Sequence, residues 1–404
     1  MNHHFKELFR LQGFRLTKTE IIGEKLIVDC RLSSNRVHCK TCGKWIKTIH
    51  QYHKPQRIKH MFWQGNIIEL AFTKRSFFCW KCKKKGLTWL TLEQAPIIGK
   101  KKRYSLAWAD QILKGLGQTT FKTQEELAKG SFTTLQKLLS ERIDPFIGVW
   151  PPEMVVRSLG IDLHSFSGTT MLPTVCNLTD HRLITILPDN KQQTMRTFLK
   201  NIPEKIKVQI EEVCIDMDCH YLRLIREELP QARIVIDFFH IVQDANYRIS
   251  SARTLIQQTK KVNLPKRLFE KNKEHLSPNE RVELNHIFTA YPELGELWWV
   301  KEQIRIIHKN PSTKLATILY EGLIKKMRLS QYPNVKQWAK TLNRWQEGIL
   351  QYFEHHTTNG YTEGVNTKLK TIKRLSYGFR NIDNYIRKAL LAFIPIGLLL
   401  YHII

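Results

Sequence analysis

The chain has 404 residues, of which 42% are hydrophobic and 25% are charged. This is the composition of an ordinary globular protein, and the length excludes one small domain, so we expect two to four. Lysine and arginine number 64 against 36 acidic residues, which gives a formal net charge of +28. Solubility alone does not require so large an excess, which indicates a polyanionic partner.

The positive charge is concentrated towards the N-terminus. Residues 1–150 contain 28 basic and 11 acidic side chains, whereas the remaining residues contain 36 and 25. The N-terminal part is therefore the first place to look for contacts with phosphate groups. A ribosomal or membrane-surface protein would explain the charge, but it would not explain the carboxylates described below.

Neither end of the sequence resembles a membrane or export signal. Residues 1–14 lack the continuous apolar core of a signal peptide. The apolar stretch from Ala389 to Ile404 is shorter than the about 20 residues of a membrane-spanning helix and contains Pro395. We predict a buried closing helix, no membrane partner, and a bacterial cytoplasmic protein associated with the nucleoid.

Residues 1–95 are interpreted as an N-terminal segment with a small β-rich metal module. Residues 57–78 are rich in β-branched and aromatic side chains, which favours strands. Two CxxC pairs bracket this stretch, and their spacing is typical of a four-thiolate zinc ribbon. Redox pairs or a chance arrangement are the alternatives. The proposed Zn²⁺ ligands are Cys39, Cys42, Cys79 and Cys82.

Residues 100–150 are interpreted as a helix-turn-helix-like DNA-binding region. Apolar spacing predicts three short helices over residues 105–116, 123–129 and 133–142, with breaks at Gly117 and Gly130. The third would be the recognition helix. A small helical linker bundle is the alternative.

The rest of the chain predicts an α/β fold with a helical insertion. Residues 151–250 show three strands, a helix, a strand, a helix, a strand and a helix, the order of an RNase H-like core. Residues 251–350 have no strand pattern and are predicted to be an α-helical insertion. Residues 351–404 are then expected to supply the C-terminal helices of the core.

Three carboxylates are candidate ligands for catalytic metal ions. Asp162 and Asp216 end the first and fourth predicted strands, which lie side by side in an RNase H-like sheet. Adjacent carboxylates repel each other unless a cation such as Mg²⁺ or Mn²⁺ lies between them. Glu363, near the start of a basic helix after the insertion, is the expected third ligand. For each residue taken alone, the alternative is a solvated strand end or a helix cap.

Other polar residues are weaker candidates. Asp218 is a rival to Asp216, whereas Asp180 and Asp189 fit turns better. Asp237 and His240, which open the helix after the fifth strand, could support the metal site or could be a helix-terminal acid and a core histidine.

Two adjacent tryptophans have a separate interpretation. Trp298 and Trp299 could stack on an exposed base, although ordinary core aromatics are favoured.

With these residues in place, the sequence resembles the ISL-three-type insertion-sequence transposases, which are DDE enzymes related to the Mutator-like transposases. The similarity runs along nearly the whole chain and is most specific in two blocks. The first block contains DMDCHY, which starts at Asp216, and the later run PQARIVIDFFHIVQDAN. The second block is EGVNTKLKTIKRLSYGFRN, which starts at Glu363. The second cysteine knuckle is tighter than in many members, and Leu163 follows the first acid where an acidic residue is common.

The resemblance implies a DNA transposase that binds terminal inverted repeats, releases 3′ hydroxyl groups and joins them to target DNA. Its catalytic residues would be Asp162, Asp216 and Glu363, and two copies or more would assemble around paired DNA ends. A non-catalytic DNA-binding regulator and an RNase H-like nuclease without strand transfer are the alternatives. The residues expected to contact DNA are Lys370, Lys373, Arg374 and Arg380.

Overall fold

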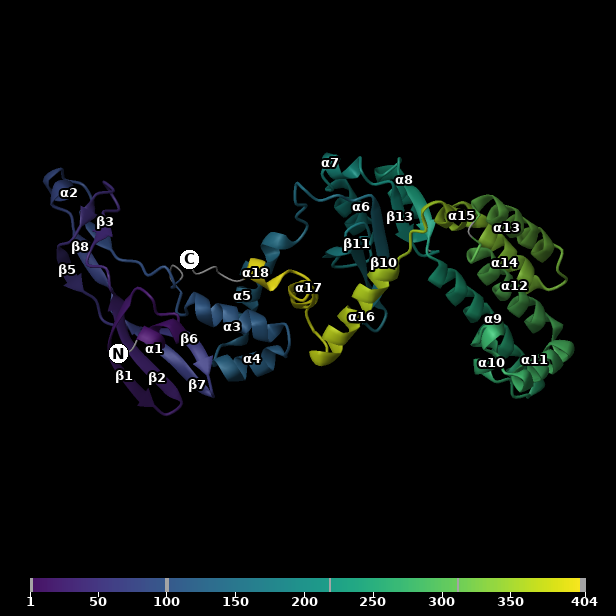
Figure 1. The fold of residues 1–404 in the computed structure, drawn as a ribbon, viewed down its shortest axis with the longest axis horizontal. Coiled ribbons are helices and arrows are strands. Elements are labelled where there is room, and N and C mark those ends of the chain that lie inside the picture. Colours follow the sequence, from purple (N-terminus) through teal and green to yellow (C-terminus); the bar gives the residue numbers. More distant parts are fainter. Residues whose placement is uncertain (1–2, 99–101, 218, 311, 400–404) are drawn as a thin grey trace. The chain divides into compact units, whose positions relative to one another are not determined.

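A computed structural model describes residues 3–98, 102–217, 219–310 and 312–399 (Figure 1). The chain divides into two compact units. The first contains Met1–Ile147 and Leu369–Ile404, and the second contains Gly148–Lys368. We expected residues 351–404 to form part of the core, but the structure groups the segment from Leu369 onward with the N-terminal residues.

A four-stranded mixed sheet forms one part of the first unit. Its strand order is β1-β2-β7-β6, in which β2 and β7 are parallel and the other neighbours antiparallel. One core cluster gathers Phe14, Val28, Leu70 and Phe72 from these strands. The elements are α1 (His3–Leu8), β1 (Phe14–Ile22), β2 (Lys25–Leu32), β6 (Gln56–Trp63) and β7 (Asn66–Phe72).

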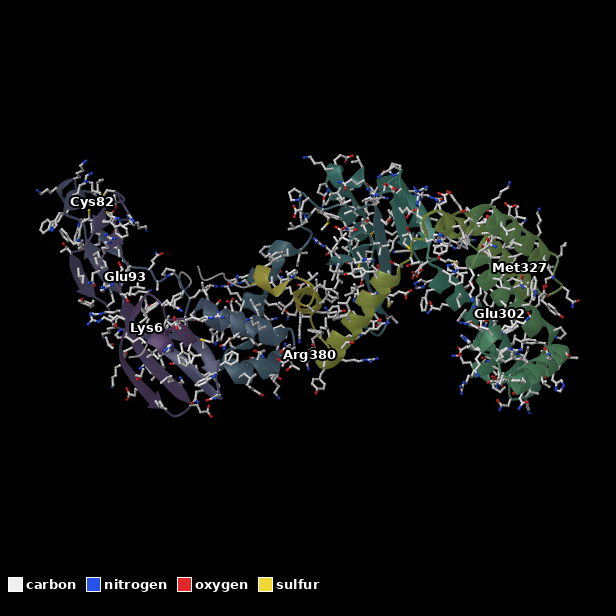
Figure 2. The ribbon with its side chains drawn as sticks, viewed as in Figure 1. Lys6, Cys82, Glu93, Glu302, Met327 and Arg380 are labelled. Carbon is white, nitrogen blue, oxygen red and sulfur yellow. The ribbon has the colours of Figure 1, made fainter. Side chains whose placement is uncertain are left out.

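Five short strands and one short helix form the β-rich module that the sequence predicts around the cysteines. β3 pairs with β4, while β5, β8 and β9 form a second small sheet. In Figure 2, Cys82 marks the end of the module that carries the thiols. The elements are β3 (Val37–His38), β4 (Trp45–Ile46), β5 (Ile49–Tyr52), β8 (Arg75–Phe78), α2 (Trp80–Lys84) and β9 (Leu90–Leu92).

A buried ion pair ties this module to the main sheet. Arg75 Nη2 lies 2.8 Å from Glu93 Oε2, and both side chains are at most 1% exposed. Arg75 also donates hydrogen bonds to the carbonyl oxygens of Leu32 and Ser34, at the end of β2. An arrangement of the module that separated the two residues would leave a buried charge without a partner or water. The pair therefore favours this arrangement of the module on the main sheet.

Three helices follow at the predicted positions, each beginning at a hydroxyl side chain. Ser105, Thr120 and Ser131 accept hydrogen bonds from the backbone N–H groups three residues later, which satisfies donors that helix starts leave free. The helices are confirmed, and their helix-turn-helix character stays a prediction. They are α3 (Leu106–Leu116), α4 (Phe121–Ala128) and α5 (Phe132–Ile143), followed by a 3-10 turn, η1 (Asp144–Phe146).

The C-terminal helix α17 (Ile382–Leu391) packs on α5 in the same unit. Arg387 Nε donates to Asp144 Oδ1 at 2.6 Å, and Lys388 Nζ donates to the Thr119 carbonyl oxygen at 2.6 Å. Beyond it lies the short α18 (Ile396–Leu399), so Pro395 interrupts the single closing helix that the sequence suggested. Among the residues described, no helix combines the length and apolar character needed to cross a bilayer.

The second unit is built on a five-stranded sheet with the order β12-β11-β10-β13-β14. The first three strands are antiparallel neighbours, whereas β13 runs parallel to both β10 and β14. The helices α6 and α8 contact each other beside the sheet. The elements are β10 (Ser158–Ser167), β11 (Thr170–Asn177), β12 (Arg182–Ile186), α6 (Gln192–Lys200), α7 (Glu204–Lys207), β13 (Glu212–Ile215), α8 (Cys219–Glu228), β14 (Arg233–Ile236) and α9 (Phe238–Lys260).

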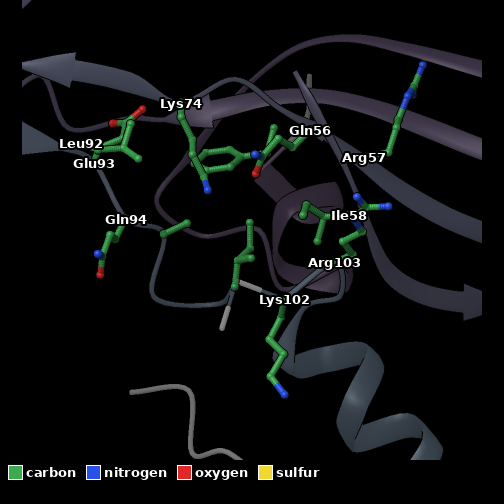
Figure 3. A pocket seen from close by; sticks show the side chains of 12 residues that line it. Gln56, Arg57, Ile58, Lys74, Leu92, Glu93, Gln94, Lys102 and Arg103 are labelled. Carbon is green, nitrogen blue, oxygen red and sulfur yellow. The ribbon is translucent and has the colours of Figure 1, made fainter. Parts of the chain in front are cut away.

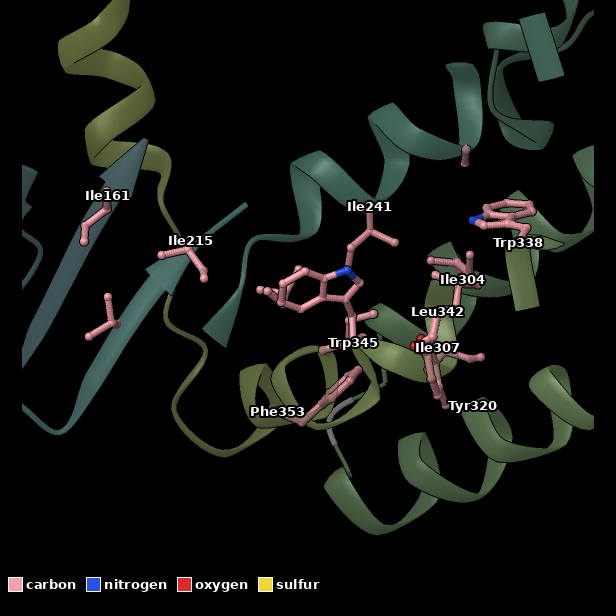
Figure 4. Close-up of a cluster of buried hydrophobic side chains, with 14 of the residues drawn as sticks. Ile161, Ile215, Ile241, Ile304, Ile307, Tyr320, Trp338, Leu342, Trp345 and Phe353 are labelled. Carbon is pink, nitrogen blue, oxygen red and sulfur yellow. The ribbon is translucent and has the colours of Figure 1, made fainter. Parts of the chain in front are cut away.

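The segment that follows α9 is helical, as the sequence predicts. Its apolar core is continuous with that of the sheet: Figure 4 shows Ile215 of β13, Ile241 of α9 and Ile304 of α12 within one buried cluster. The elements are α10 (Lys266–Glu270), η2 (Lys273–His275), α11 (Pro278–Ala290), α12 (Pro292–His308), α13 (Thr313–Arg328), α14 (Pro333–Arg344), α15 (Gln346–His355) and α16 (Gly360–Leu375).

The adjacent tryptophans of α12 belong to this helical packing. Trp298 and Trp299 are partly buried against the core. Lys301 Nζ lies 5.6 Å from the ring of Trp298, and Lys326 Nζ lies 4.0 Å from the ring of Trp299. These contacts favour the structural interpretation over base stacking.

Candidate active site

Three aspartates lie on or just after neighbouring strands of the sheet. Gly160 of β10 is in register with Cys214 of β13, and Ile215 of β13 with Ile236 of β14. Asp162 lies two residues beyond the last β10–β13 pair, and Asp216 and Asp237 each follow the last residue of β13 and β14. Neighbouring strands are about 4.8 Å apart, so this topology places the three aspartates near one another at one edge of the sheet.

The first strand is longer than the sequence suggested. We expected it to end at Asp162, but β10 continues to Ser167 because Leu163 and His164 pair with Pro173 and Leu172 of β11. Its pairing with β13 stops at Gly160, and β13 itself ends at Ile215. Asp162 therefore lies inside β10 just beyond this pairing, and the residue is 9% exposed.

His240 joins the predicted acids into one cluster. Its Nε2 atom lies 2.7 Å from Asp216 Oδ1. Potential ligand atoms of Asp162, Asp216 and His240 all lie within 4.8 Å of one another, and so do those of Asp237, His240 and Glu363. The structure thus brings the three predicted acids around one histidine, with Asp237 as a fourth carboxylate.

Polar contacts place the helix that carries Glu363. Asn359 Nδ2 donates to the backbone carbonyl oxygen of Ile161 at 3.3 Å. The backbone carbonyl oxygen of Asn359 accepts a hydrogen bond from Glu363 N at 2.9 Å. A Cβ atom at Gly160 would lie 2.4 Å from both Asn359 Oδ1 and Thr362 Oγ1. Only glycine at this position lets α16 approach β10 so closely.

A chain of buried hydrogen bonds fixes the position of the Asp162 carboxylate. Asn366 Nδ2 donates to Asp162 Oδ2 at 2.7 Å, and Thr174 Oγ1 donates to Asn366 Oδ1 at 2.6 Å. His164 Nδ1 lies 2.8 Å from Thr174 Oγ1 and is the donor that completes the chain. In each of these contacts one group can act only as the donor and the other only as the acceptor. The chain therefore fixes the orientation of the Asn366 amide and of the Asp162 carboxylate.

The electrostatics of the cluster reflect crowding of like charges. Burial and the charge of Asp216 raise the pKa of Asp162 to about 6. Burial and the contact with Asp237 raise the pKa of Glu363 to about 7. Burial lowers the pKa of His240, but Asp216 and the other acids outweigh this and raise that pKa to about 9. An imidazolium therefore balances part of the negative charge at neutral pH.

The cluster has the chemistry of a divalent-cation site. The buried oxygens Asp237 Oδ2 and Glu363 Oε1 accept no hydrogen bond from the described part of the chain. Buried carboxylate oxygens are costly without a partner. Hard cations such as Mg²⁺ and Mn²⁺ take oxygen ligands of this kind, so the residues present fit such an ion.

The weaker carboxylate candidates lie elsewhere or cannot be placed. Asp189 Oδ1 accepts hydrogen bonds from Thr194 Oγ1 and Lys191 N at the start of α6, and Asp180 lies in the turn between β11 and β12. Both fit the turn interpretation. Asp218 lies outside the described residues.

The basic residues expected to contact DNA lie in and after the second half of α16. Lys370, Arg374 and Arg380 are exposed, and Lys373 is half-buried. In Figure 2, Arg380 lies beyond α16 in the first unit. Their exposure is consistent with a contact surface, and their role stays a prediction.

The four predicted thiols also converge. Cys39 Sγ lies 3.7 Å from Cys82 Sγ, and Cys42 Sγ lies 3.8 Å from Cys79 Sγ. Four thiolates about 2.3 Å from a tetrahedral Zn²⁺ would be about 3.8 Å apart. Burial raises the pKa of Cys39, but the backbone N–H groups of Cys42 and Thr41 and the other thiols outweigh it and lower the pKa to about 6.

The contributions of Thr174, His164 and Asn359 were not anticipated from the sequence. Thr174 is paired with Asp162 through the register of β10 with β11, so its contacts with Asn366 and His164 depend on that pairing. A partial signal was present, because Asn359, Thr362 and Asn366 follow the spacing of one helix face, which is unusually polar for a buried helix.

Replacing Asn366 tests whether the buried chain positions Asp162. We expect Asn366→Ala to weaken Mn²⁺ binding by about 10- to 100-fold, because it removes a partner that orients a metal ligand. Titration with Mn²⁺, followed by electron paramagnetic resonance, measures the affinity. Asn334→Ala, which removes an exposed amide in α14, is the matched control. Unchanged Mn²⁺ affinity in a folded Asn366→Ala chain would contradict the positioning role.

Comparison with known proteins assigns the chain to a family. A family model described as Transposase, of the DDE ISL3 type, matches residues 159–389, which is more than half of the chain and contains the acidic cluster. The transposase for insertion sequence element IS1001 of Bordetella parapertussis is 22% identical over 402 residues, covering 95% of this chain and 96% of the relative. The transposase for insertion sequence element IS1557 of Mycobacterium tuberculosis is 22% identical over 285 residues, 62% of each chain. The chain therefore belongs to the ISL3 family of insertion-sequence transposases.

Proposed function

We propose that this transposase binds the terminal inverted repeats of its element, and cleaves and rejoins DNA strands at the acidic cluster of the second unit. The observation that carries this proposal is the cluster in which Asp162 and Asp216 meet His240, and Asp237 and Glu363 meet the same histidine. Four buried or partly buried carboxylates around a single histidine favour a bound cation.

Asp162, Asp216 and Glu363 would hold Mg²⁺ or Mn²⁺. A pair of such ions, when bound, activates the attacking oxygen and neutralises the leaving oxygen of an in-line displacement at phosphorus. The protein's part is positioning. Asn366 orients Asp162, and the polar docking of α16 on β10 holds Glu363 within reach of the sheet.

His240 and Asp237 support the acids in this proposal. With its pKa raised to about 9, His240 carries a positive charge 2.7 Å from Asp216 and offsets part of the negative charge of the cluster. Asp237 shares the cluster with Glu363. The sheet order, with three antiparallel strands followed by two parallel ones, supports an RNase H-like core.

The remaining parts of the proposal concern DNA recognition. Zn²⁺ at Cys39, Cys42, Cys79 and Cys82 would stabilise the β-rich module. The helices α3 to α5 and the basic residues of and after α16 would contact duplex DNA through its phosphates. Two or more copies would hold both element ends and the target together.

Labelled element ends and target DNA provide the test. We expect nicks at the element termini when Mg²⁺ is added to the full chain, followed by joined products, and no reaction when divalent cations are omitted. Products are resolved by denaturing electrophoresis. Cleavage without joining would indicate a nuclease, and binding without cleavage would indicate a regulator; either result would contradict the proposal.

A further inference from the structure

A cationic pocket lies in the first unit, separate from the acidic cluster. It has a volume of about 570 Å³ and is formed where β6, β7, β9 and the segment before α3 meet. The volume is in the range of pockets that bind small ligands or parts of larger ones. Figure 3 shows Lys74 on one side of the pocket and Arg57 and Arg103 on the other.

The charges of the pocket are not balanced by its own acids. Its acidic side chain, Glu93, is engaged by Arg75 in the buried ion pair. Lys102 donates to Glu141 at 2.6 Å. In the described parts of the chain, no ion pair or side-chain hydrogen bond involves Arg57, Lys74 or Arg103. Three cations that line one pocket without a partner among the described residues favour a bound anion.

The frame of the pocket is fixed by backbone contacts. Lys59 N donates to the Arg103 carbonyl oxygen at 3.0 Å, and Ser105 N donates to the Lys59 carbonyl oxygen at 2.8 Å. These bonds attach the segment with Arg103 to β6, and Ser105 caps α3. His53 N also donates to the Lys74 carbonyl oxygen at 2.9 Å. Backbone hydrogen bonds therefore fix the main chain that carries Arg103 and Lys74, and Arg57 lies in β6, which lowers the cost of ordering the pocket on binding.

We propose that this pocket binds phosphate groups of the DNA backbone and so anchors the duplex independently of its sequence. The inference rests on the proposed function, because it takes DNA as the substrate. Arginine and lysine supply most protein contacts to phosphates, which position a protein on DNA without reading bases. The pocket lies in the more cationic part of the chain, next to the three helices predicted to bind DNA.

A triple variant, Arg57→Gln, Lys74→Gln and Arg103→Gln, tests the pocket. The control variant, Arg15→Gln, Lys18→Gln and Lys25→Gln, removes the same charge from exposed positions of β1 and β2. DNA binding by the full chain is measured by fluorescence anisotropy at several salt concentrations without added divalent cation. Each lost phosphate contact lowers the slope of log K against log salt by about 0.9. We expect the pocket variant to lose two to three such contacts and to bind any sequence about 10- to 100-fold more weakly near 0.15 M salt.

The outcomes separate the pocket from the overall function. A folded pocket variant with the affinity and salt slope of the control would overturn the pocket proposal while leaving the transposase function intact. Failure of the wild-type chain to bind DNA would instead overturn the proposed function. A parallel titration with pyrophosphate distinguishes the source of phosphate. If the pocket variant loses pyrophosphate binding but keeps its DNA affinity, the assignment to the DNA backbone is wrong.

Discussion

Glu363→Gln should abolish strand cleavage by this transposase while leaving its affinity for element ends unchanged. The substitution keeps the size of the side chain but removes the negative charge that a divalent cation requires. Loss of one member of a group of catalytic residues that act as a unit costs about 10⁴- to 10⁶-fold in rate. The rate of nicking at saturating Mg²⁺ measures the effect, and anisotropy with the same DNA measures binding.

A matched control and a thermal readout make this test specific. Glu347→Gln removes a carboxylate that is 83% exposed and pairs with Arg226, so it should cleave DNA at the wild-type rate. Because the pKa of Glu363 is raised from 4.5 to about 7 in the folded chain, this residue lowers stability as pH rises between those values, and at pH 8 the full penalty is present in the absence of a cation. At pH 8 without Mg²⁺, Glu363→Gln should therefore melt no lower than the wild type.

Added Mg²⁺ should reverse this order. It should raise the melting temperature of the wild-type chain more than that of Glu363→Gln, because only the wild type has the full ligand set. If Glu363→Gln cleaves DNA at the wild-type rate, or if Mg²⁺ raises the melting temperatures of both chains equally, Glu363 is not a metal ligand.

Local sequence patterns were sufficient to predict the strands of the sheet, but not the residues at which each strand ends. The strands around Asp162, Asp216 and Ile236 are short apolar runs between turn residues, which is a strong signal. The extension of β10 to Ser167 depends on pairing with β11 and leaves no apolar signal, because residues 164–167 are mostly polar.

The placement of the C-terminal segment required contacts distant in sequence. Residues 351–404 were expected to supply the C-terminal helices of the core, whereas the part from Leu369 onward belongs to the first unit. The ion pair of Arg387 with Asp144 joins positions separated by 243 residues. The residue pattern of α17 or of η1 does not indicate which distant segment it will contact.

The acids of the candidate site could be predicted from the order of strands and helices, but the contacts that depend on strand register could not. Asp162, Asp216 and Glu363 were identified from fold order and from the family resemblance. That His240 lies between them follows from the first turn of α9, and that Thr174 supports Asn366 follows from cross-strand pairing. Neither relation can be derived from spacing along the sequence.

Removal of zinc should unfold the β-rich module of the first unit. Among the described residues, the buried cluster around the thiols consists of Cys39, Cys79 and Cys82, with Cys42, Ile46 and Trp89 partly buried against it. Phe77 and Phe78 of β8 add two buried rings, but so small an apolar core does not offset the entropy of ordering the module's loops. Bound Zn²⁺ contributes on the order of 10 kcal/mol in small zinc modules, so its loss should exceed the module's own stability.

Cys79→Ser is the variant that tests this dependence, with Cys30→Ala as its control. Cys30 is buried in the core of the four-stranded sheet and lies outside the thiol cluster. We expect metal analysis to find one Zn²⁺ per wild-type or Cys30→Ala chain and none in Cys79→Ser. Limited proteolysis should then cut Cys79→Ser between residues 33 and 95, and a strong zinc chelator should produce the same cuts in the wild type. A protease-resistant module without zinc would show that the buried pair of Arg75 and Glu93, together with the short strands, is sufficient to fold it.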